Sequence, residues 1–543
     1  MNVARAIATA LKAEGVDLLF AYPVNPLIEA AAEEDIRTVI VRQERVGLHM
    51  ADAYSRVNSG DKIGVFCMQH GPGSENAFGG VAQAFSESVP ILVVPGGYPR
   101  RLAHRYPNFN STLNMRNVTK WAEPLTMGAA VPEVMRRIFS QLRNGRPGPV
   151  LLEVAADLWN EDVPEGWVHT PTLTARSAPD PADVAEAARV LARAEAPVIY
   201  AGQGVHWAKA WEELKVFAET WNIPVTTSIE GKSAFPETHP LSLGSGGRSN
   251  PRPVKRFLAE ADAILGVGCS FAFTNYGVAM PRDKTIIHAT VDPSDLNKDV
   301  AVQHGLVGDA KLTLQALHHA MEGMDRAKAE SRHAVGQKIA DLRREWLAEW
   351  EPKLTSTESP ISPYRVIAEL NRLVDKDRTI VTHDAGSPRD QMTPFWESVA
   401  PLSYLGWGKT TQLGYGLGLA MGAKLARPQH LCINVWGDAA IGFTGMDLET
   451  AARERIAILS ILFNNHAMAI EIPVMPVSQA KYGAIEITGN YADMAEALGC
   501  FGERITDPAE IVGALKRGIA ATEEGRPALL EFMTEKEVAI SNE

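Results

Sequence analysis

The stretch LCINVWGDAA, residues 431–440, decides the fold of the last third of the chain. Its apolar run predicts a buried strand that ends in Gly437-Asp438 and is followed by small residues. A second apolar run, IAILSILF at 456–463, ends in Asn464-Asn465. The segment 445–455 is predicted to be the helix that crosses from one strand to the next. Two parallel strands joined in this way end side by side at one edge of a sheet.

Oxygen-bearing side chains are therefore expected to meet where the two strands end. Asp438 and Asn465 can offer oxygen ligands to one hard cation, and the backbone amides after Gly437 face the same point. This arrangement suits a magnesium-bridged pyrophosphate. The alternative is an ordinary strand–helix–strand unit that ends in polar turn residues.

The bulk composition limits the classes of protein to which the chain can belong. Its 543 residues predict two to four domains, and 45% hydrophobic with 22% charged residues is typical of a soluble globular protein. A net charge of −12 without a long basic run argues against nucleic acid, or an anionic membrane surface, as the main partner. No apolar run reaches the ~18 residues that a membrane helix needs. Residues 1–15 predict an amphipathic helix rather than a signal peptide.

The cysteines indicate the compartment. They are scattered and lie mostly in apolar runs, which predicts buried thiols rather than a metal or disulfide framework. A reducing, cytoplasmic location is expected from this pattern. The four residues are Cys67, Cys269, Cys432 and Cys500.

Alternating helix and strand patterns predict an α/β fold with three domains, each a doubly wound parallel sheet. The predicted domains are residues 1–165, 181–325 and 360–543. Linkers are predicted at 161–180 and 351–363, and a charged helix at 327–350. Besides the two strands above, strands are predicted at 18–21, 38–41, 63–68, 91–94, 150–153, 197–201, 223–227, 263–267, 285–291 and 528–532.

The Gly-Asp and Asn-Asn pairs, flanked by strands at this interval, resemble the cofactor motif of thiamine diphosphate enzymes. The three predicted domains are similar to the pyrimidine-binding, central and pyrophosphate-binding domains of the acetolactate synthase-like branch, over nearly the whole chain. The resemblance extends to GPG at 71–73, GK at 231–232, FPETHP at 235–240, VDP at 291–293 and LNK at 296–298.

This resemblance implies thiamine diphosphate as the coenzyme and Mg²⁺ as the ion that holds its diphosphate. The metal ligands would be the side chains of Asp438 and Asn465 and the backbone carbonyl of Ala467, an oxygen-only set that suits Mg²⁺. Leu413 would lie under the bent coenzyme, where many relatives have Met. The other residues assigned to coenzyme binding are Gly71, Gly437, Ala439, Ala440 and Met468.

Glu44 is the candidate for the buried acid that thiamine diphosphate chemistry requires. It follows a predicted strand directly and opens a helix. The alternative is an ordinary acid in the first turn of a helix. Family members carry a Glu here, usually followed by Gln, whereas Arg45 follows in this chain. In the family the first and third domains of one site come from different subunits, so a homodimer is implied, with a homotetramer expected.

Two further residues are candidates for proton transfer to the substrate. His70 lies in a loop after a strand, beside the Gly-Pro-Gly turn, and the alternative is a surface or structural histidine. Glu471 occupies the place of a catalytic Glu in pyruvate decarboxylase-like enzymes, and the alternative is a solvated acid on a helix face. The substrate pocket is expected to include Val24, which replaces a usual Gly, together with Asn25, Gln69 and His70.

The leading hypothesis is a thiamine diphosphate- and Mg²⁺-dependent enzyme that makes or breaks a carbon–carbon bond next to a carbonyl. The substrate would be a 2-keto acid, decarboxylated with or without joining to a second carbonyl compound such as an aldehyde. One alternative is an acyl-CoA enzyme, because the segment 442–450 (GFTGMDLET) is similar to oxalyl-CoA decarboxylase and 2-hydroxyacyl-CoA lyase. Another is a non-catalytic binding or regulatory homologue.

The central domain leaves three possibilities open: FAD, ADP or no ligand. Acetolactate synthases bind FAD in this domain. Gly202-Gln203-Gly204 follows a predicted strand, which is a weak nucleotide signal. No residue pattern requires the cofactor.

Overall fold

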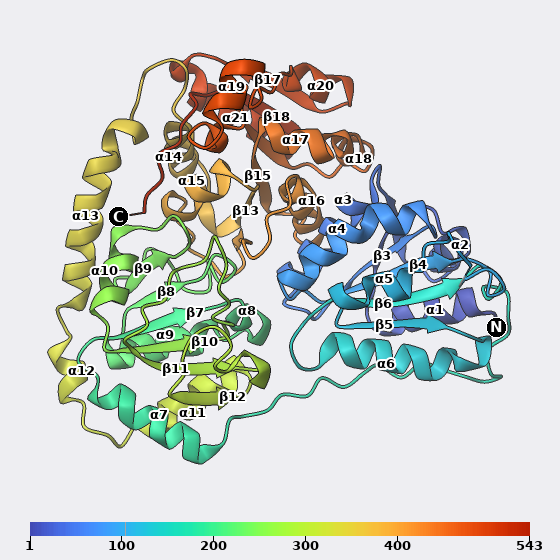
Figure 1. Cartoon of the computed structure of the whole chain (residues 1–543), viewed down its shortest axis with the longest axis horizontal. Helices are drawn as coiled ribbons and strands as arrows, with labels where there is room; N and C mark the ends of the chain where they lie inside the picture. Colours follow the sequence, from blue (N-terminus) through green and yellow to red (C-terminus); the bar gives the residue numbers. More distant parts are fainter. Residues whose placement is uncertain (104, 543) are drawn as a thin grey trace.

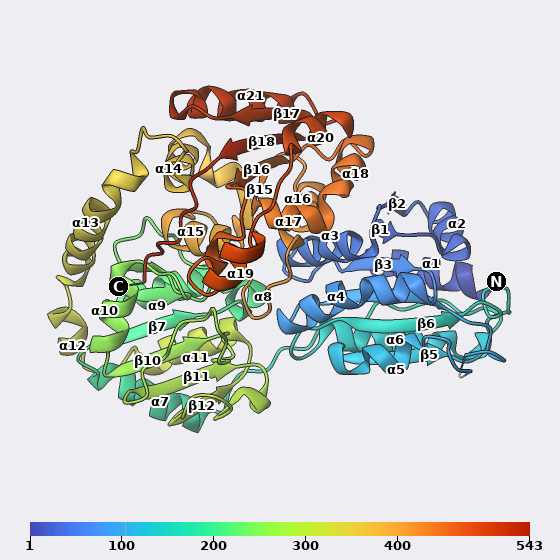
Figure 2. The ribbon, with the colours of Figure 1, turned by 45° about the horizontal axis from the view of Figure 1, so that its top comes forward.

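The computed structural model describes residues 1–103 and 105–542, and in this part of the chain it contains three parallel sheets of six strands each. Helices cover the sheets, and the three sheet units lie around a common centre (Figures 1 and 2). This confirms the predicted α/β fold class with three doubly wound parallel sheets. None of the helices in the described ranges combines the length and the apolar character that a bilayer crossing requires.

The first sheet is made of β1 (Leu18–Ala21), β2 (Arg37–Ile40), β3 (Gly64–Met68), β4 (Ile91–Gly97), β5 (Trp121–Leu125) and β6 (Val150–Ala155). Their order in space is β2-β1-β3-β4-β6-β5. Every residue of β1, β3 and β4 is buried, as expected for parallel strands covered on both faces. Helix α3 (Glu44–Val57) follows β2, and helix α4 (Pro72–Ser86) follows β3.

The second sheet is made of β7 (Pro197–Ala201), β8 (Val225–Thr227), β9 (Ser242–Ser245), β10 (Ala263–Val267), β11 (Thr285–Thr290) and β12 (His304–Val307). Their order is β12-β11-β10-β7-β8-β9. The predicted helix at 327–350 is two helices, α12 (Ala327–Ser331) and α13 (Val335–Leu354). The second of these continues into the predicted linker at 351–363, so that prediction was wrong at its start.

The third sheet is made of β13 (Thr379–His383), β14 (Tyr404–Leu405), β15 (Leu431–Gly437), β16 (Leu459–Asn464), β17 (Phe501–Ile505) and β18 (Ala528–Met533), in the order β14-β13-β15-β16-β18-β17. The crossover between β15 and β16 begins earlier than predicted. It starts at Asp438 as α17 (Asp438–Thr444), passes through a 3-10 turn at Gly445–Asp447 and ends as α18 (Leu448–Arg453). An acid is favoured in the first turn of a helix, which explains how the helix can begin at Asp438.

The closest contact between the first and third domains is made by one helix from each domain. Helix α16 (Tyr415–Ala426) packs along α3 (Figure 2). A Cβ placed on Gly418 would come within 2.4 Å of the Cβ of His49, and one on Gly422 within 2.2 Å of the carbonyl oxygen of Met50. The glycines of α16 are therefore required by close backbone packing, and one hydrophobic core runs through both domains.

Candidate active site

The predicted meeting of two strand ends is present in the third sheet. Strands β15 and β16 are parallel neighbours, with Gly437 opposite Phe463. The Asp438 carboxylate accepts the backbone N–H groups of Asn465 and Ala467, each at 3.2 Å, and of Ala439 at 2.9 Å. The side-chain oxygen of Asn465 accepts the same N–H of Ala467 at 3.0 Å. Two side-chain oxygens therefore converge on one backbone amide.

The two asparagines of the double Asn have different surroundings. Asn464 is fully buried, donates to Glu531 at 2.7 Å and accepts the N–H of His466 at 3.1 Å. Asn465 is half-buried beside Asp438. The first asparagine holds the loop in place, and the second presents its oxygen at the strand ends.

The oxygen atoms at this point fit a hard cation with a phosphate ligand. Asp438 is 4% exposed, and burial raises the pKa of its carboxyl, although the backbone amides around it lower it. A Cβ on Gly437 would meet no atom of the described residues within 4 Å, so there is open space in front of the first turn of α17. No cluster of three or more His, Cys, Asp or Glu side chains able to hold a metal occurs in residues 1–103 and 105–542. A metal here would be held by a carboxylate, an amide oxygen, a backbone carbonyl and its own ligand's oxygens, which suits Mg²⁺.

Glu44 is a buried acid at the N-terminus of α3. Its residue is 5% exposed, and burial raises the pKa of its carboxyl, although its own backbone amide and the Asn76 side chain lower it. A Cβ on Gly73 would lie 3.4 Å from a carboxyl oxygen of Glu44. The acid therefore faces the Gly-Pro-Gly turn rather than solvent, which is unlike an ordinary first-turn acid.

Arg45, the atypical neighbour of Glu44, contacts the third domain. Its guanidinium lies 5.9 Å from the centre of the Phe443 ring. The backbone N–H of Arg42 donates to Asp447 at 2.8 Å. Within one chain, the start of α3 therefore lies against α17 and the 3-10 turn that follows it.

His70 is half-buried and follows β3 at the carboxyl edge of the first sheet. Its ring is 4.6 Å from the ring of Tyr98, which follows β4. The hydroxyl of Tyr98 lies over Gly71, where a Cβ would come within 2.8 Å and where the backbone has φ of +62°. Val24 is buried and approaches Gly96 beside the backbone of His70, whereas Asn25 and Gln69 are exposed. Tyr98 was not predicted, because no motif marks it and only the pairing of β3 with β4 brings it to His70.

Leu413 lies immediately before α16 and packs, partly buried, against the core that joins the first and third domains. The turn after it is held by Asp384, whose carboxylate accepts the N–H groups of Gly414 at 2.9 Å and Gly416 at 3.0 Å. Burial raises the pKa of Asp384 to about 6. Asp384 directly follows the buried strand β13, as Asp438 follows β15, but it was not predicted, because the polar residues in β13 hid that strand.

Met468 and Glu471 lie beyond the double Asn. The N–H of Met468 donates to the carbonyl of Ile485 at 2.8 Å, and Glu471 ends a short 3-10 helix and is half-buried. Among the interactions of the described residues in one chain, none joins Glu44 or His70 to Asp438, Asn465 or Glu471. The structure therefore brings the predicted residues together in two groups, one on the first sheet and one on the third.

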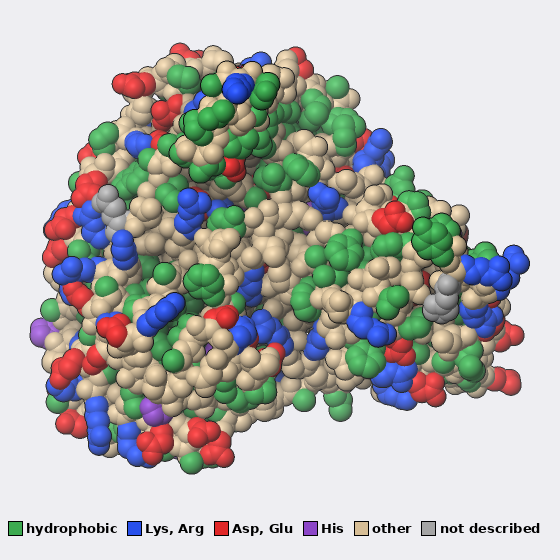
Figure 3. Space-filling view, viewed as in Figure 1, with side chains coloured by type: hydrophobic (Ala, Val, Ile, Leu, Met, Phe, Trp, Pro, Cys, Tyr) green, Lys and Arg blue, Asp and Glu red, His purple; other side chains and the backbone are tan. Residues whose placement is uncertain are grey.

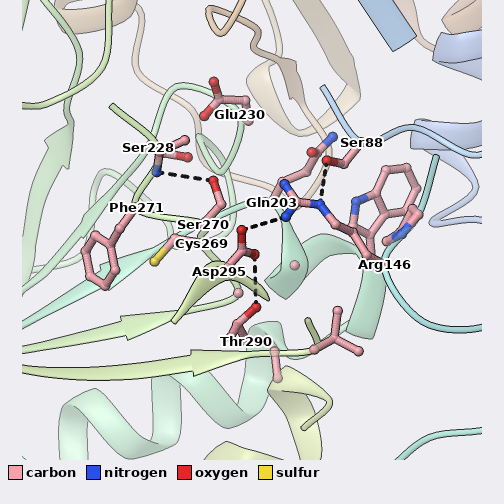
Figure 4. A pocket seen from close by; sticks show the side chains of 18 of the residues that line it. Ser88, Arg146, Gln203, Ser228, Glu230, Cys269, Ser270, Phe271, Thr290 and Asp295 are labelled. Atoms are coloured by element: carbon pink, nitrogen blue, oxygen red, sulfur yellow. Dashed lines mark hydrogen bonds and ion pairs between the residues drawn. The ribbon is translucent and has the colours of Figure 1, made fainter. Parts of the chain in front are cut away.

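A separate cavity of about 970 Å³ lies between the first and central domains. Figure 4 shows side chains of both domains around it, among them Arg146, Glu230 and Asp295. Arg146 bridges the two domains, because its guanidinium donates to Ser88 of the first domain at 3.2 Å and to Asp295 of the central domain at 2.7 Å. A Cβ on Gly204 would come within 2.6 Å of the backbone of Gly268, so the predicted glycine segment packs tightly at the cavity. The volume is in the range of sites for small molecules and cofactors.

Family models match three parts of the chain. Residues 1–119 match the N-terminal TPP binding domain of thiamine pyrophosphate enzymes, residues 184–317 their central domain and residues 384–532 their C-terminal TPP binding domain. Together the three models cover most of the chain, in the order that the sequence predicts.

Individual relatives match the chain from end to end. A probable acetolactate synthase large subunit of Methanococcus aeolicus is 29% identical, over 100% of this chain and 93% of its own length. Its counterpart in Methanocaldococcus jannaschii is 28% identical, over 99% and 93%. Acetolactate synthase isozyme 3 large subunit of Escherichia coli is 27% identical, over 97% and 93%.

Proposed function

The chain belongs to the thiamine pyrophosphate enzymes, and we propose that it decarboxylates a 2-keto acid and joins the remaining carbon unit to a second carbonyl compound. It is a thiamine diphosphate-dependent enzyme of the acetolactate synthase-like kind. The observation that carries the proposal is the convergence of the Asp438 and Asn465 oxygens on the amide of Ala467, beside open space at the start of α17.

We assign the metal and the diphosphate to the third domain. Asp438, Asn465 and the carbonyl of Ala467 would hold Mg²⁺, while Gly437, Ala439 and Ala440 allow the backbone to approach the diphosphate. The N-terminus of α17 adds a favourable dipole for an anion. Met468 and Leu413 would contact the coenzyme, and Gly71 would border it from the first domain. When bound, thiamine diphosphate supplies an electron sink for a carbanion next to a carbonyl.

The chain's own residues would handle protons and exclude water. Glu44 would hold a proton at its carboxyl for the pyrimidine ring of the coenzyme, a role that its burial and raised pKa support. His70 and Glu471 are proposed as the acid and base toward the substrate. The substrate pocket is proposed to include Val24, Asn25, Gln69 and His70.

We propose a homodimer or homotetramer in which the first domain of one chain completes the site of another. The support is exposed apolar surface, which lies near α19 (Pro476–Tyr482) and on α4. Figure 3 shows hydrophobic side chains gathered over the region of α19. Val474, Val477 and Tyr482 are 69%, 64% and 81% exposed, and Phe78 and Phe85 on α4 are also exposed.

The ligand proposed for the cavity of about 970 Å³ is FAD or ADP. Support comes from the tight glycine packing at Gly202 and Gly204 and from the cations Arg146 and Lys409 on its wall. Denaturing the purified protein and separating the released small molecules tests this, because FAD and ADP differ in absorbance and mass.

We also propose the boundaries 1–165, 181–325 and 360–543 for the three domains, within which the matched family segments lie. A cytoplasmic location is proposed on the four free, buried cysteines.

The direct test of the function is CO₂ release from a panel of 2-keto acids, with and without thiamine diphosphate and Mg²⁺. Mass spectrometry of the products separates simple decarboxylation, which leaves an aldehyde, from joining to a second carbonyl compound. Coenzyme-dependent release from one of these acids is expected. Failure of the protein to take up thiamine diphosphate at any Mg²⁺ concentration would contradict the proposal.

A further inference from the structure

The segment 406–412, which leads into Leu413, contains no helix or strand and is held by side chains of the first domain. The guanidinium of Arg56, on α3, donates to the carbonyl of Gly406 at 2.9 Å. The side chain of Gln83, on α4, contacts the backbone carbonyl of Thr410 at 3.2 Å and its hydroxyl at 2.9 Å. His49, on α3, pairs with the side chain of Gln412 at 3.0 Å. The conformation of this loop therefore depends on another domain.

Glu87 makes the most unusual of these contacts. It is the C-terminal cap of α4 and is fully buried. One carboxylate oxygen accepts two consecutive backbone N–H groups, from Gly408 at 3.2 Å and Lys409 at 2.9 Å. The other oxygen is buried and has no hydrogen-bond partner among the described residues. A carboxylate at the C-terminus of a helix also opposes the helix dipole. The unpartnered oxygen and the opposed dipole both make the free energy of this buried carboxylate less favourable, yet Glu87 lies here and holds the loop.

The loop also borders the cavity between the first and central domains. Lys409 and Glu230 both line that cavity, and Figure 4 shows Glu230 on its wall. The charged groups that act on Glu87 come from all three domains: Arg56, Glu230 and Lys409. The phenol of Tyr415 is also nearby, and its pKa is raised by burial, with a contribution from the Glu87 carboxylate. Glu87 therefore lies between the cavity and the residues that precede Leu413.

We propose that Glu87 is a positioning residue for the coenzyme site: by holding the amides of Gly408 and Lys409 it fixes the loop 406–412 and, through it, Leu413. The proposal rests on the proposed function, in which Leu413 supports the coenzyme. Glu87 touches neither substrate nor coenzyme, and it acts through the loop. The ionised form holds the loop best, because a carboxylate is a stronger acceptor than a neutral carbonyl oxygen.

We call the two hydrogen bonds from the amides of Gly408 and Lys409 to Glu87 the clamp. Its strength near neutral pH depends on whether the Glu87 carboxyl is protonated. Burial raises the pKa of Glu87 to about 7, and the nearby carboxylate of Glu230 adds to the shift, while Lys409 and Arg56 lower it. At pH 8 the carboxylate holds both amides, and at pH 6 the protonated acid holds them less well. A residue that merely fills space would show no such change.

Hydrogen exchange of the full-length protein without coenzyme tests the clamp, read by mass spectrometry on peptides that cover 406–414. Glu87→Ala and Glu87→Gln are compared with the wild-type protein at pH 6 and at pH 8. Faster exchange in both variants is expected at pH 8. For the nearly isosteric Glu87→Gln the difference from wild type shrinks at pH 6, where the wild-type acid is protonated too.

Binding of thiamine diphosphate with Mg²⁺, measured by calorimetry at pH 8, is the second readout. Loss of a charge-assisted hydrogen bond predicts affinity about tenfold weaker in Glu87→Ala. The matched control is Glu14→Gln, since Glu14 is also a buried acid that accepts a backbone N–H, from Thr172 at 2.9 Å. This control is expected to loosen the region of Thr172 and to leave both 406–414 and coenzyme affinity unchanged.

The outcomes separate the two proposals. Wild-type exchange rates at 406–414 in Glu87→Gln at pH 8 would overturn the clamp, even if Glu87→Ala fails to fold. A difference from wild type that is equal at pH 6 and pH 8 would overturn the role of the charge. Absence of coenzyme binding in the wild-type protein would overturn the proposed function, while the exchange experiment would still decide the clamp.

Discussion

The carboxylate of Asp438 and the backbone N–H of Asn465, 27 positions apart in the chain, are joined by a hydrogen bond of 3.2 Å. The same carboxylate oxygen accepts the N–H of Ala467. These bonds close the loop after β16 onto the first turn of α17, so that the strand ends and their oxygens form one rigid edge. The metal and coenzyme assignments depend on this edge.

Replacing Asp438 with Ala is expected to weaken binding of Mg²⁺ and thiamine diphosphate together, by at least about tenfold each. The variant loses both the anionic ligand and the acceptor of the Asn465 and Ala467 amides. Isothermal titration calorimetry measures both affinities. Asp507→Asn, at an exposed helix cap on the same domain, is the control and should bind as wild type does. Unchanged affinity for both ligands in Asp438→Ala would place the metal elsewhere.

Glu44→Gln and Glu44→Ala are expected to lower kcat by about 10²- to 10⁴-fold, the usual contribution of a positioned acid. The fold should persist, because the carboxyl lies at a helix N-terminus and makes no ion pair among the described residues. Coenzyme-dependent CO₂ release and circular dichroism measure the two effects. Near-normal turnover in either variant would refute the assignment of Glu44.

Glu44 should also leave a signature in the pH dependence of stability. A carboxyl whose pKa is raised on folding favours the folded state below its unfolded pKa, and that contribution is lost as the pH rises through the folded pKa. Burial raises the pKa of Glu44, so the wild-type protein should lose stability relative to Glu44→Gln as the pH rises from 4 toward neutrality. Thermal unfolding of the two proteins at several pH values tests this, and a constant difference in Tm would contradict it.

Gly422→Ala is expected to destabilise the protein by about 1–3 kcal/mol, because the new Cβ would collide with the backbone of α3. Gly323→Ala is the control, since a Cβ there meets nothing within 4 Å in the described structure. Denaturant unfolding compares the two. Equal midpoints would show that α3 and α16 can move apart at no cost.

The variant His70→Gln tests whether His70 transfers protons during the reaction or only stabilises the fold. If His70 is an acid or base, kcat/KM falls by about 10²-fold or more while Tm stays close to wild type. Tyr98→Phe keeps the ring that lies against His70 and is expected to retain most of the activity. A large loss of Tm with unchanged kcat would identify His70 as a structural residue.

The sequence predicted the central strands well and the edges of the sheets poorly. Strands β5, β9, β12, β14 and β17, which all lie at sheet edges, were missed, and so was β13. Edge strands are short or partly exposed, as β17 and β5 are, so their apolar runs are weak. The crossover helix was placed too late because small residues after Asp438 resemble a loop, whereas the acid itself begins the helix.

Within the site, local motifs were found and distant contacts were not. Asp438 and Asn465 follow apolar strands and stand out in the sequence. Glu87 meets Gly408 across 321 positions, and Asp384 meets Gly414 across 30. The first contact arises from the packing of two domains and the second from the folding of the third domain, and no local periodicity in the sequence encodes either.

The close packing of α3 against α16 means that the first and third domains cannot change independently at this contact. Gly418 lies against the Cβ of His49 and Gly422 against the backbone of Met50, with no space for a methyl group, so a larger residue at either glycine would push the two helix backbones apart. A chimera that joins the first domain of this chain to the third domain of a distant relative would keep both sheets and lose this fit. Recombination between such relatives is therefore expected to succeed only when both helices are exchanged as a pair.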